Sequence, residues 1–403
     1  MTDRAATGRT AIVGADVVTP DAVLEQHAVI VEQDAILAVV PIAELPQTLP
    51  RHQLDGGYLT PGLIDIHVHG AAGRGFNEAT EEAFAEVGRT LLAAGVTTAL
   101  PSLGSAPIDD LRRALDALAA VQGLEGLPEL PGVHFEGPYF APEQRGAQSL
   151  DDLRTPDDGS IDTLLERPDL VRMMSFAPEL PGAVRLTERL VAAGVVAAAG
   201  HSGGTDADLA SCQAAGLSHV IHLYSGQSSL TRRGPWRVPG LLEATLASEG
   251  LTVELIADGR HLPEPLMRIA YRCLAGNLCL VSDATAGAGL PDGSRYRIGR
   301  HEYLVEDGVG VTLDKASFGG STTLLPAMLP VAAATFDCSL PELIAMFTTI
   351  PARAARLAGV GRIAPGQRAD LLQLDRDLVP RQTYHRGAWR PCVPPRNAHT
   401  TGE

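Results

Sequence analysis

Residues 62–69 have the sequence Gly-Leu-Ile-Asp-Ile-His-Val-His, an apolar run that ends in two histidines, His67 and His69. Side chains alternate along a strand, so a spacing of two places both imidazoles on the same face. Farther on, residues 81–94 are rich in Ala, Leu and Glu, and their apolar side chains recur at helical spacing. This alternation of strand-like and helical stretches continues along the chain, and it predicts βα units around a parallel sheet.

The chain contains eight apolar runs, most of which end in polar residues, and eight is the number needed to close a (β/α)₈ barrel. We therefore predict an α/β fold in which residues 59–361 form a TIM-type barrel. In such barrels the active site lies at the carboxyl ends of the strands. The runs are residues 63–67, 97–101, 132–136, 171–177, 195–201, 219–222, 251–258 and 278–283.

Both ends of the chain have strand and turn character. The first sixty residues contain short β-branched runs, such as 10–13 and 28–31, separated by Gly, Asp and Pro. Near the other end, residues 303–313 and 369–374 are typical of strands and residues 341–357 of a helix. We expect the tail to return and pair with the N-terminal strands. This gives a small β-sandwich domain built from residues 1–58 and 362–403.

The composition restricts the class of protein. A chain of 403 residues with 45% hydrophobic residues is long enough for a large buried core. Its formal net charge of −16 and its pI near 5.2 argue against a partner that is nucleic acid or an anionic membrane. Residues 1–20 lack the pattern of a secretory signal, and no run of about 18 apolar residues predicts a membrane span. Five scattered cysteines favour buried thiols, so we expect a cytoplasmic protein.

Histidine and carboxylate side chains end several of the eight runs. On the shared face of a parallel barrel they would meet despite their separation in sequence. Neutral imidazole and carboxylate are the ligands that hold zinc and similar divalent metals, so the pattern predicts a metal site. The alternative is a set of polar residues satisfied by ordinary hydrogen bonds, with no metal. The converging residues are His67, Glu136, His201, His222, Asp258 and Asp283.

Several motifs resemble those of a known family. Residues 61–70 look like the first-strand motif of the amidohydrolase superfamily. Later motifs narrow the resemblance to the N-acetylglucosamine-6-phosphate deacetylase family, and the similarity extends from about Leu59 to Leu374. These motifs are His134-Phe135-Glu136-Gly137-Pro138, Ala199-Gly200-His201-Ser202, His222-Leu223-Tyr224, Ile256-Ala257-Asp258-Gly259-Arg260-His261 and Leu280-Val281-Ser282-Asp283-Ala284-Thr285.

By this resemblance Glu136, His201 and His222 hold the principal divalent metal, for which we predict Zn²⁺. Three protein ligands leave a position open for water, whose pKa the metal lowers.

Asp283 is implied as the acid/base, which takes a proton from the water and returns it to the leaving amine. Taken alone, an aspartate at this place also suits the N-cap of a helix. Some members of the family lack the HxH pair and others retain it. Here His67 and His69 allow a second metal bridged by Glu136.

The resemblance also implies substrate contacts. His261 and Arg237 match family positions associated with the sugar phosphate, and arginine donates two parallel hydrogen bonds to a phosphate. In the family some of these contacts come from a neighbouring subunit, which implies a homodimer. The alternative for Arg232, Arg233 and Arg237 is that they are solvated loop charges.

Two departures from the family pattern affect the substrate prediction. Ser225-Gly226-Gln227 stands where the family usually has Asn-Ala-Met, and the stretch to Arg237 is several residues longer. Gly146-Ala147-Gln148 stands where the family often has histidine in the third position. We expect Ala147, Gln148, Ser225 and Gly226 to contact the substrate. Gln148 can hydrogen-bond a hydroxyl but carries no charge.

Three functional hypotheses follow. The first is a metal-dependent amidohydrolase that deacetylates N-acetylglucosamine 6-phosphate to glucosamine 6-phosphate and acetate. The second is a deacetylase of a different or unphosphorylated N-acetyl amino sugar in a biosynthetic pathway, which the two departures favour. The third is a catalytically inactive relative used for binding or assembly. The complete set of ligands and base argues against the third.

Overall fold

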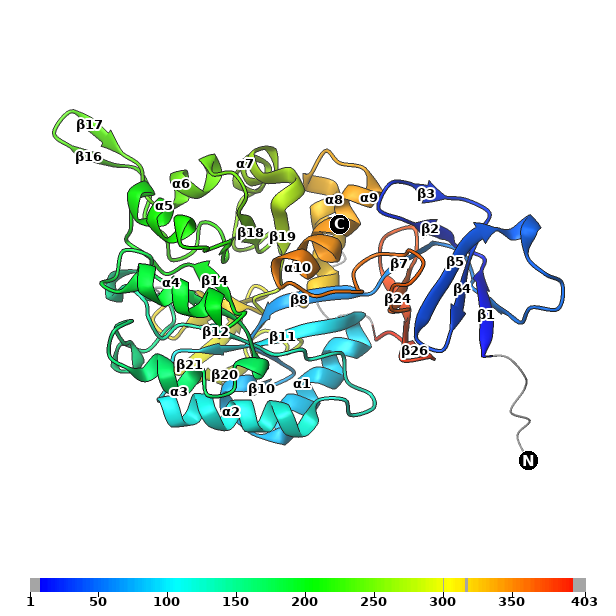
Figure 1. Ribbon diagram of the computed structural model, residues 1–403, viewed down its shortest axis with the longest axis horizontal. Coiled ribbons are helices and arrows are strands. Elements are labelled where there is room, and N and C mark those ends of the chain that lie inside the picture. The colour runs from blue at the N-terminus through cyan, green and yellow to red at the C-terminus, as the bar shows by residue number, and fades with distance from the viewer. Residues whose placement is uncertain (1–7, 300, 316–317, 394–403) are drawn as a thin grey trace.

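The computed structural model describes residues 8–299, 301–315 and 318–393 (Figure 1). Its centre is a parallel sheet in which neighbouring strands have the order β8, β11, β12, β13, β14, β15, β18, β19. Each strand lies on one of the eight predicted runs, and every ladder between them is parallel. The predicted barrel is confirmed. In the same order, the strands cover Leu63–Val68, Val96–Gly104, Val133–Glu136, Val171–Phe176, Val196–Ala199, His219–Val220, Thr252–Leu255 and Leu278–Leu280.

The sheet closes where its first and last strands meet. The Asp283 N–H donates to the His67 carbonyl at 2.9 Å, and the His69 N–H donates to the Ala284 carbonyl at 2.7 Å. Asp65 adds a side-chain contact, since its Oδ1 accepts from the Ser282 N–H at 3.2 Å. The closure therefore uses residues that follow β19, at the carboxyl end of the barrel. A short ladder of β9 (Gly70–Ala71) and β10 (Arg74–Gly75) follows β8.

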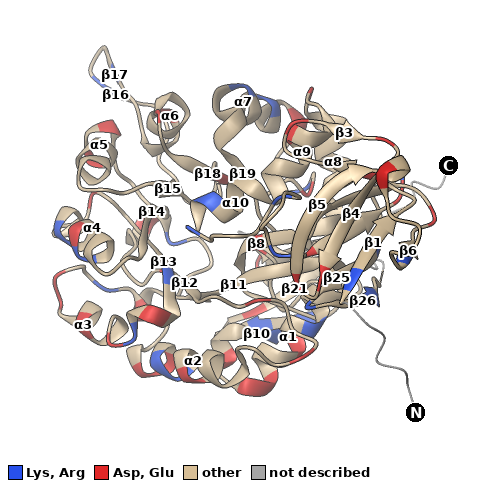
Figure 2. Ribbon diagram, turned by 45° about the vertical axis from the view of Figure 1, so that its right-hand side comes forward, with Lys and Arg blue, Asp and Glu red and all other residues tan. Residues whose placement is uncertain are grey.

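Helices cover the outside of the barrel. The first of them begins after Thr80, whose Oγ1 accepts from the Ala83 N–H at 3.2 Å, and it buries Phe84, Val87 and Leu91. Charged residues of both signs lie along the outer helices (Figure 2). The helices are α1 (Glu81–Ala94), α2 (Ile108–Val121), α3 (Ser160–Leu164), α4 (Ala183–Ala192), α5 (Asp206–Ala214), α6 (Leu241–Ala247), α7 (Glu264–Leu274), α8 (Met328–Thr335), α9 (Leu340–Phe347) and α10 (Thr349–Ala354).

The prediction of one helix over residues 341–357 is wrong, because the structure divides this stretch into α9 and α10. Thr348 leaves the helical conformation, with φ −139° and ψ −76°. Pro351 follows three residues later and has no N–H to bond back to the preceding turn. A continuous helix would therefore lose a hydrogen bond here. The Thr348 hydroxyl instead donates to the Ile344 carbonyl at 2.7 Å and supports the end of α9.

Two further sheets lie at the ends of the chain, one of N-terminal strands alone and one that combines strands from both ends. One has the order β5, β4, β1, β6, and the other β26, β25, β24, β7, β2, β3. Antiparallel pairing of β24 with β7 joins the tail to the N-terminal segment, as predicted. Ile12, Val29, Leu59, Leu371 and Tyr384, from both sheets, belong to one apolar cluster. The strands are β1 (Arg9–Val13), β2 (Asp16–Val18), β3 (Val23–Leu24), β4 (His27–Glu32), β5 (Ala35–Pro41), β6 (Arg51–Gln53), β7 (Tyr58–Pro61), β24 (Leu371–Leu374), β25 (Pro380–His385) and β26 (Ala388–Pro391).

These two sheets confirm the small β-sandwich. The division of the chain at residues 58 and 362 stays a prediction, and residues 1–7 and 394–403 of that domain lie outside the described ranges.

The prediction of a single strand over residues 303–313 is wrong. Asp307 and Gly308 both have positive φ, 51° and 73°, and form the turn of a hairpin. An Asp-Gly pair is typical of a two-residue hairpin turn, but the prediction considered only the apolar residues of this stretch. The hairpin belongs to a four-stranded antiparallel sheet that follows β19, and we call it the roof sheet. Its strands are β20 (Arg295–Ile298), β21 (His301–Glu306), β22 (Val309–Thr312) and β23 (Phe318–Ser321).

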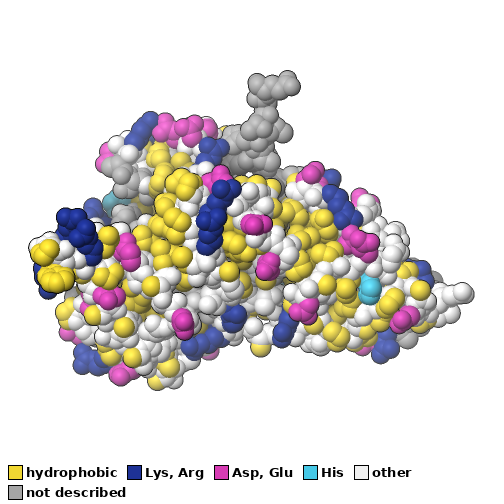
Figure 3. Space-filling model, turned by 90° about the horizontal axis from the view of Figure 1, so that it is seen from above, with side chains coloured by type: hydrophobic (Ala, Val, Ile, Leu, Met, Phe, Trp, Pro, Cys, Tyr) yellow, Lys and Arg dark blue, Asp and Glu magenta, His cyan; other side chains and the backbone are white. Residues whose placement is uncertain are grey.

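A second hairpin projects from the barrel at the left of Figure 1. It consists of β16 (Thr231–Arg233) and β17 (Trp236–Val238), and we call it the arginine hairpin. Basic and hydrophobic side chains gather on this projection at the left edge of Figure 3. Trp236 is 74% exposed.

Within the described ranges, no helix has the length and hydropathy needed to cross a membrane. All five cysteines are free thiols. Cys212 and Cys279 are buried, whereas Cys273 is exposed, which corrects the expectation of buried thiols for that residue. The cytoplasmic location stays a prediction.

Arg386, which follows β25, joins the terminal sheets to the barrel. Its Nε donates to Glu129 Oε1 at 2.7 Å, and its Nη1 donates to the carbonyls of Gly123 and Leu124 at 2.8 and 3.1 Å. The Glu129 N–H in turn donates to the carbonyl of Thr97 in β11 at 2.9 Å. One side chain thus fixes a terminal strand against the amino end of the barrel.

We expect Arg386→Ala to lower the free energy of unfolding by about 2 kcal/mol, because hydrogen bonds to charged groups contribute about 1.5–3 kcal/mol. The control is Arg381→Ala, which removes an exposed ion pair with Asp375 and should cost less than about 1 kcal/mol. Urea denaturation measures both. Equal losses in the two variants would contradict the role given to Arg386.

Candidate active site

The carboxyl end of the barrel gathers the side chains that end its strands. Glu136 is the last residue of β12, and His67 lies in β8. His201, His222 and Asp283 follow the ends of β14, β15 and β19, and their φ angles are 46°, 23° and 45°. Non-glycine residues rarely adopt positive φ, and those that do gather at functional sites. The sharp turns that leave these strands bring the five side chains together.

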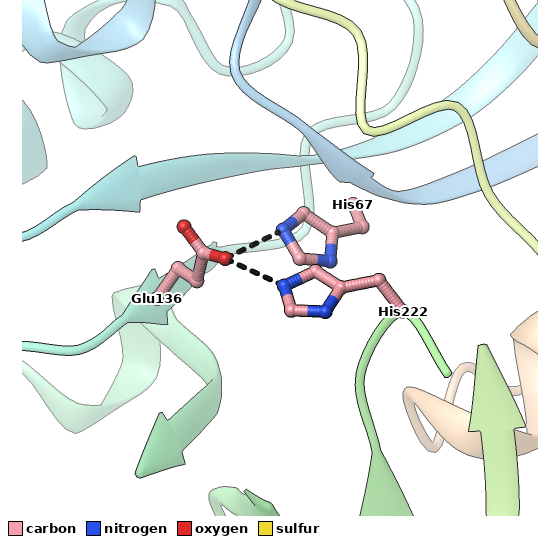
Figure 4. Close-up of side chains that lie close together, drawn as sticks. All are labelled: His67, Glu136 and His222. Atoms are coloured by element: carbon pink, nitrogen blue, oxygen red, sulfur yellow. Dashed lines mark hydrogen bonds and ion pairs between the residues drawn. The ribbon is translucent and has the colours of Figure 1, made fainter. Parts of the chain in front are cut away.

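Glu136 is the centre of the cluster. Its Oε1 lies 3.0 Å from Nε2 of His201, 3.0 Å from Nε2 of His222 and 3.6 Å from Nε2 of His67. Figure 4 shows the carboxylate facing both His67 and His222. Burial raises the pKa of Glu136, but hydrogen bonds from the imidazoles outweigh burial and hold that pKa well below its usual range. Glu136 is therefore an ionised carboxylate.

His69 and Asp283 complete the cluster. His69 Nε2 lies 3.4 Å from Glu136 Oε2 and 3.4 Å from Asp283 Oδ1. Burial raises the pKa of Asp283, but His69 and the other nearby imidazoles outweigh burial and keep that pKa below its ordinary value. The backbone of Asp283 is held on both sides, by the His67 carbonyl at 2.9 Å and by the Ser321 N–H at 2.8 Å.

The donor set fits a divalent cation. Two groups have ligand atoms within 4.8 Å of one another: His67, Glu136 and His222, and His67, His69 and Asp283. Among the described residues His67 Nε2 has no hydrogen-bond partner, although the side chain is completely buried. A buried polar atom without a partner is costly, and a cation shared with the carboxylates would stabilise it. Imidazole and carboxylate are ligands that suit zinc and similar metals.

Two predicted residues lie outside these groups. His201 contacts Glu136 but belongs to neither group. Its Nδ1 donates to the Gln144 carbonyl at 2.8 Å, so a neutral His201 turns the lone pair of Nε2 toward Glu136, an arrangement that a cation between them stabilises. Asp258 instead holds His261, since its Oδ2 lies 2.7 Å from His261 Nδ1.

Sequence reasoning missed two buried carboxylates because they lie inside apolar runs rather than at their ends. Glu254 in β18 accepts from His67 Nδ1 at 2.7 Å and from His219 Nε2 at 2.9 Å. Asp65 in β8 has its pKa raised to about 7 by burial. A charged residue within an otherwise apolar strand is the signal that could have found both.

A cavity of about 550 Å³ opens over the cluster. Five of the six residues predicted to contact a substrate line it: Ala147, Gln148, Ser225, Gly226 and His261.

Arg237, the sixth, does not line the cavity. It lies on the arginine hairpin, where its Nη1 donates to the Pro235 carbonyl at 3.0 Å. Among the described residues that line the cavity there is no lysine or arginine. The roof sheet contributes Ile298, His301 and Phe318 to the wall.

Gln148 contacts the cluster itself. Its Nε2 donates to Glu136 Oε2 at 2.5 Å, and its Oε1 accepts from the Ser105 N–H at 2.7 Å. Each end of the amide therefore has one partner. Gln148 holds Glu136 Oε2, which His69 also approaches at 3.4 Å, and leaves Oε1 to the other three imidazoles. A second hydrogen on Nε2 and a second lone pair on Oε1 can still bond a substrate hydroxyl.

Gly226 is required by the close approach of its loop to His201. Its φ is +57°, and a Cβ at this position would lie 2.7 Å from His201 Nδ1 and 3.0 Å from the Gln144 carbonyl oxygen. Such contacts would displace the hydrogen bond that orients His201.

Gly226→Ala should therefore weaken cation binding by about 10- to 100-fold, the usual effect of disturbing the groups that orient a ligand. Isothermal titration of the metal-free protein measures it. The matched control is Gly234→Ala in the arginine hairpin, with φ +61° and nothing within 4 Å of the added Cβ. It has the same backbone penalty but should keep the wild-type cation affinity. A similar loss of cation affinity in both variants would contradict the role given to the contact between Gly226 and His201.

Comparison with known proteins agrees with this geometry. The model of the Amidohydrolase family matches residues 58–392, and that of the NagA composite domain matches residues 11–59. An N-acetylgalactosamine-6-phosphate deacetylase of Escherichia coli O157:H7 is 30% identical over 373 residues, 92% of this chain and 96% of that protein.

Solved structures agree over nearly the whole chain. N-acetylglucosamine-6-phosphate deacetylase from Pasteurella multocida has a TM-score of 0.89 at 26% identity, covering 95% of this chain and 100% of that chain. A mutant of the Mycobacterium smegmatis N-acetyl-D-glucosamine-6-phosphate deacetylase, in complex with N-acetyl-D-glucosamine-6-phosphate, has a TM-score of 0.87 at 30% identity, covering 96% and 99%. The protein thus belongs to the amidohydrolase family.

Proposed function

We propose that the protein is a metal-dependent deacetylase of an N-acetyl amino sugar 6-phosphate, with N-acetylglucosamine 6-phosphate as the first candidate. The observation that carries the proposal is the cluster of Glu136, four imidazoles and Asp283 beside a cavity of about 550 Å³. The names of the similar proteins support the substrate class, since they are deacetylases of amino sugar 6-phosphates.

Glu136, His201 and His222 would hold a first cation, and His67 and His69 with Glu136 would hold a second. We propose Zn²⁺ for these sites, because neutral imidazole and carboxylate are its ligands in hydrolases. When bound, the cation activates water and polarises the acetyl carbonyl.

Asp283 has the properties of the acid/base. Its lowered pKa keeps it ionised near neutral pH, so it can accept the proton of the attacking water. Protonated Asp283 can then deliver that proton to the leaving nitrogen, because an amine departs from a tetrahedral carbon only after protonation. Two backbone hydrogen bonds, to the His67 carbonyl at 2.9 Å and from the Ser321 N–H at 2.8 Å, hold Asp283 in place during both transfers.

We expect Asp283→Asn to reduce the rate of acetate release from N-acetylglucosamine 6-phosphate by about 10²- to 10⁴-fold, the range for loss of a general acid–base group. Cation content, measured by mass spectrometry, should stay at the wild-type value and so separate loss of the base from loss of the metal. A zinc-loaded wild-type protein that releases no acetate from any N-acetyl amino sugar would favour the inactive relative instead.

A second candidate substrate is an unphosphorylated or different N-acetyl amino sugar. The observation that favours it is the cavity wall, which includes Asp110 and Asp152 but, among the described residues, no lysine or arginine. A phosphate dianion is bound best by such cations. Comparing kcat/KM for N-acetylglucosamine, its 6-phosphate and N-acetylgalactosamine 6-phosphate distinguishes the candidates. A preference for the unphosphorylated sugar would rule out the first.

We propose a homodimer in which the arginine hairpin of a second copy brings basic side chains to this cavity, whose described lining residues include no lysine or arginine. Arg232, Arg233 and Arg237 lie together on this projection. Trp236 and Leu230, 74% and 55% exposed, are apolar side chains suited to burial against a partner. The position of Arg237, away from the cavity of its own chain, supports the same arrangement.

Co-expression of two inactive variants tests this arrangement. If Arg237 serves the neighbouring cavity, mixed dimers of Arg237→Ala with Asp283→Asn contain one site that has both residues. Random pairing should then restore about one quarter of the wild-type activity toward the 6-phosphate, because half of the dimers are mixed. Each variant alone is the control and should remain weak. Activity no higher than the sum of the separate variants would count against the shared site.

A further inference from the structure

A completely buried carboxylate, Glu254 of β18, lies behind the cation-binding residues. Its Oε2 accepts from His67 Nδ1 at 2.7 Å and from the His222 N–H at 3.2 Å. Its Oε1 accepts from His219 Nε2 at 2.9 Å. Three donors thus occupy the two oxygens, so Glu254 is a partner of the ligands and not a ligand itself.

Glu254 determines which nitrogen of His67 faces the cluster. An ionised carboxylate only accepts hydrogen bonds, so the contact places the hydrogen of His67 on Nδ1. Nε2 then points to the space between Glu136 Oε1, at 3.6 Å, and Asp283 Oδ1, at 3.7 Å. A carboxylate behind a ligand histidine fixes its tautomer and the orientation of its ring.

Glu254 is itself held firmly. His219 contacts the Thr252 hydroxyl through Nδ1 at 2.7 Å, and the backbone carbonyl of Glu254 accepts from the Leu223 N–H at 2.8 Å. The residue therefore connects β8 with the turn that follows β15. Among the residues proposed for the first cation, which are Glu136, His201 and His222, Glu254 contacts only the backbone N–H of His222.

We infer that Glu254 is a positioning residue for the second cation: it presents His67 Nε2 to that cation, which His69 and Glu136 would also hold. The first cation, at Glu136, His201 and His222, depends on Glu254 much less. This inference rests on the proposed metal dependence of the protein, but not on the identity of the sugar.

Titration of the metal-free protein with cobalt(II), followed by visible absorbance and by metal analysis, tests the inference. We expect two equivalents to bind to the wild type, each with its own absorbance change. Glu254→Leu, which removes both the acceptor and the charge, should bind the first equivalent normally and the second about 10- to 100-fold more weakly. Glu254→Gln retains an acceptor for His67 and should lie between them.

Asp370→Asn is the matched control, because Asp370 is also a buried carboxylate beside an imidazole, with His385 Nδ1 at 2.6 Å from its Oδ1. It lies before β24, in the region of the terminal sheets, and should bind two equivalents even if the protein is less stable. Loss of the second equivalent in this control would attribute the effect to stability and overturn the inference.

Two other results would also overturn it: a wild type that binds one equivalent, or a Glu254→Leu variant that binds two with unchanged affinity. If Glu254→Leu does not fold, Glu254→Gln replaces it in the test. An unchanged affinity of Glu254→Gln for the second equivalent of cobalt(II) would then overturn the inference. A wild type that binds two cations but releases no acetate would refute the proposed function and leave the role of Glu254 intact.

Discussion

Backbone hydrogen bonds between β8 and the segment after β19 close the barrel, and one of them, from the Asp283 N–H to the His67 carbonyl, also places Asp283 in the site. Buried backbone groups must be paired, so the first and last strands of the sheet have to find partners in one another. The partners lie in the segment that follows β19. Closing the sheet therefore places the carboxylate of Asp283 beside the imidazoles of His67 and His69. The hydrogen bonds that close the barrel also keep these side chains in fixed positions.

Carboxylates and imidazoles alternate from the cavity into the interior of the barrel. His67 lies between two carboxylates, Glu136 on the cavity side and Glu254 behind it. Burying an ionised carboxylate is costly unless it is paired and hydrogen-bonded, and here each one serves several imidazoles. The imidazoles of His201 and His222 complete the layer around Glu136. A bound cation would balance the negative charge of the buried carboxylates in place of protons on the imidazoles.

Much of the fold could be predicted from the sequence, because apolar runs and the polar residues that end them are local patterns. All eight strands and the convergence of Glu136, His201, His222 and Asp283 follow from such patterns. The partner of His67 could not be found in this way, since Glu254 lies 187 residues away and only the closed barrel brings the two together. The roof sheet was missed for a different reason. Its turn at Asp307 and Gly308 lies inside a stretch that, judged by its apolar residues alone, is typical of one strand.

The roof sheet has a consequence for selectivity. Ser321, at the end of β23, donates its N–H to the Asp283 carbonyl at 2.8 Å and accepts from the Thr285 N–H at 3.0 Å. The same sheet supplies Ile298, His301 and Phe318 to the cavity wall. The roof sheet therefore contacts both the cavity wall and the backbone of Asp283. If Asp283 is the base, as proposed, a sugar that displaces the roof sheet would also misalign the proton acceptor. The enzyme would then discriminate through its turnover rate as well as through its affinity.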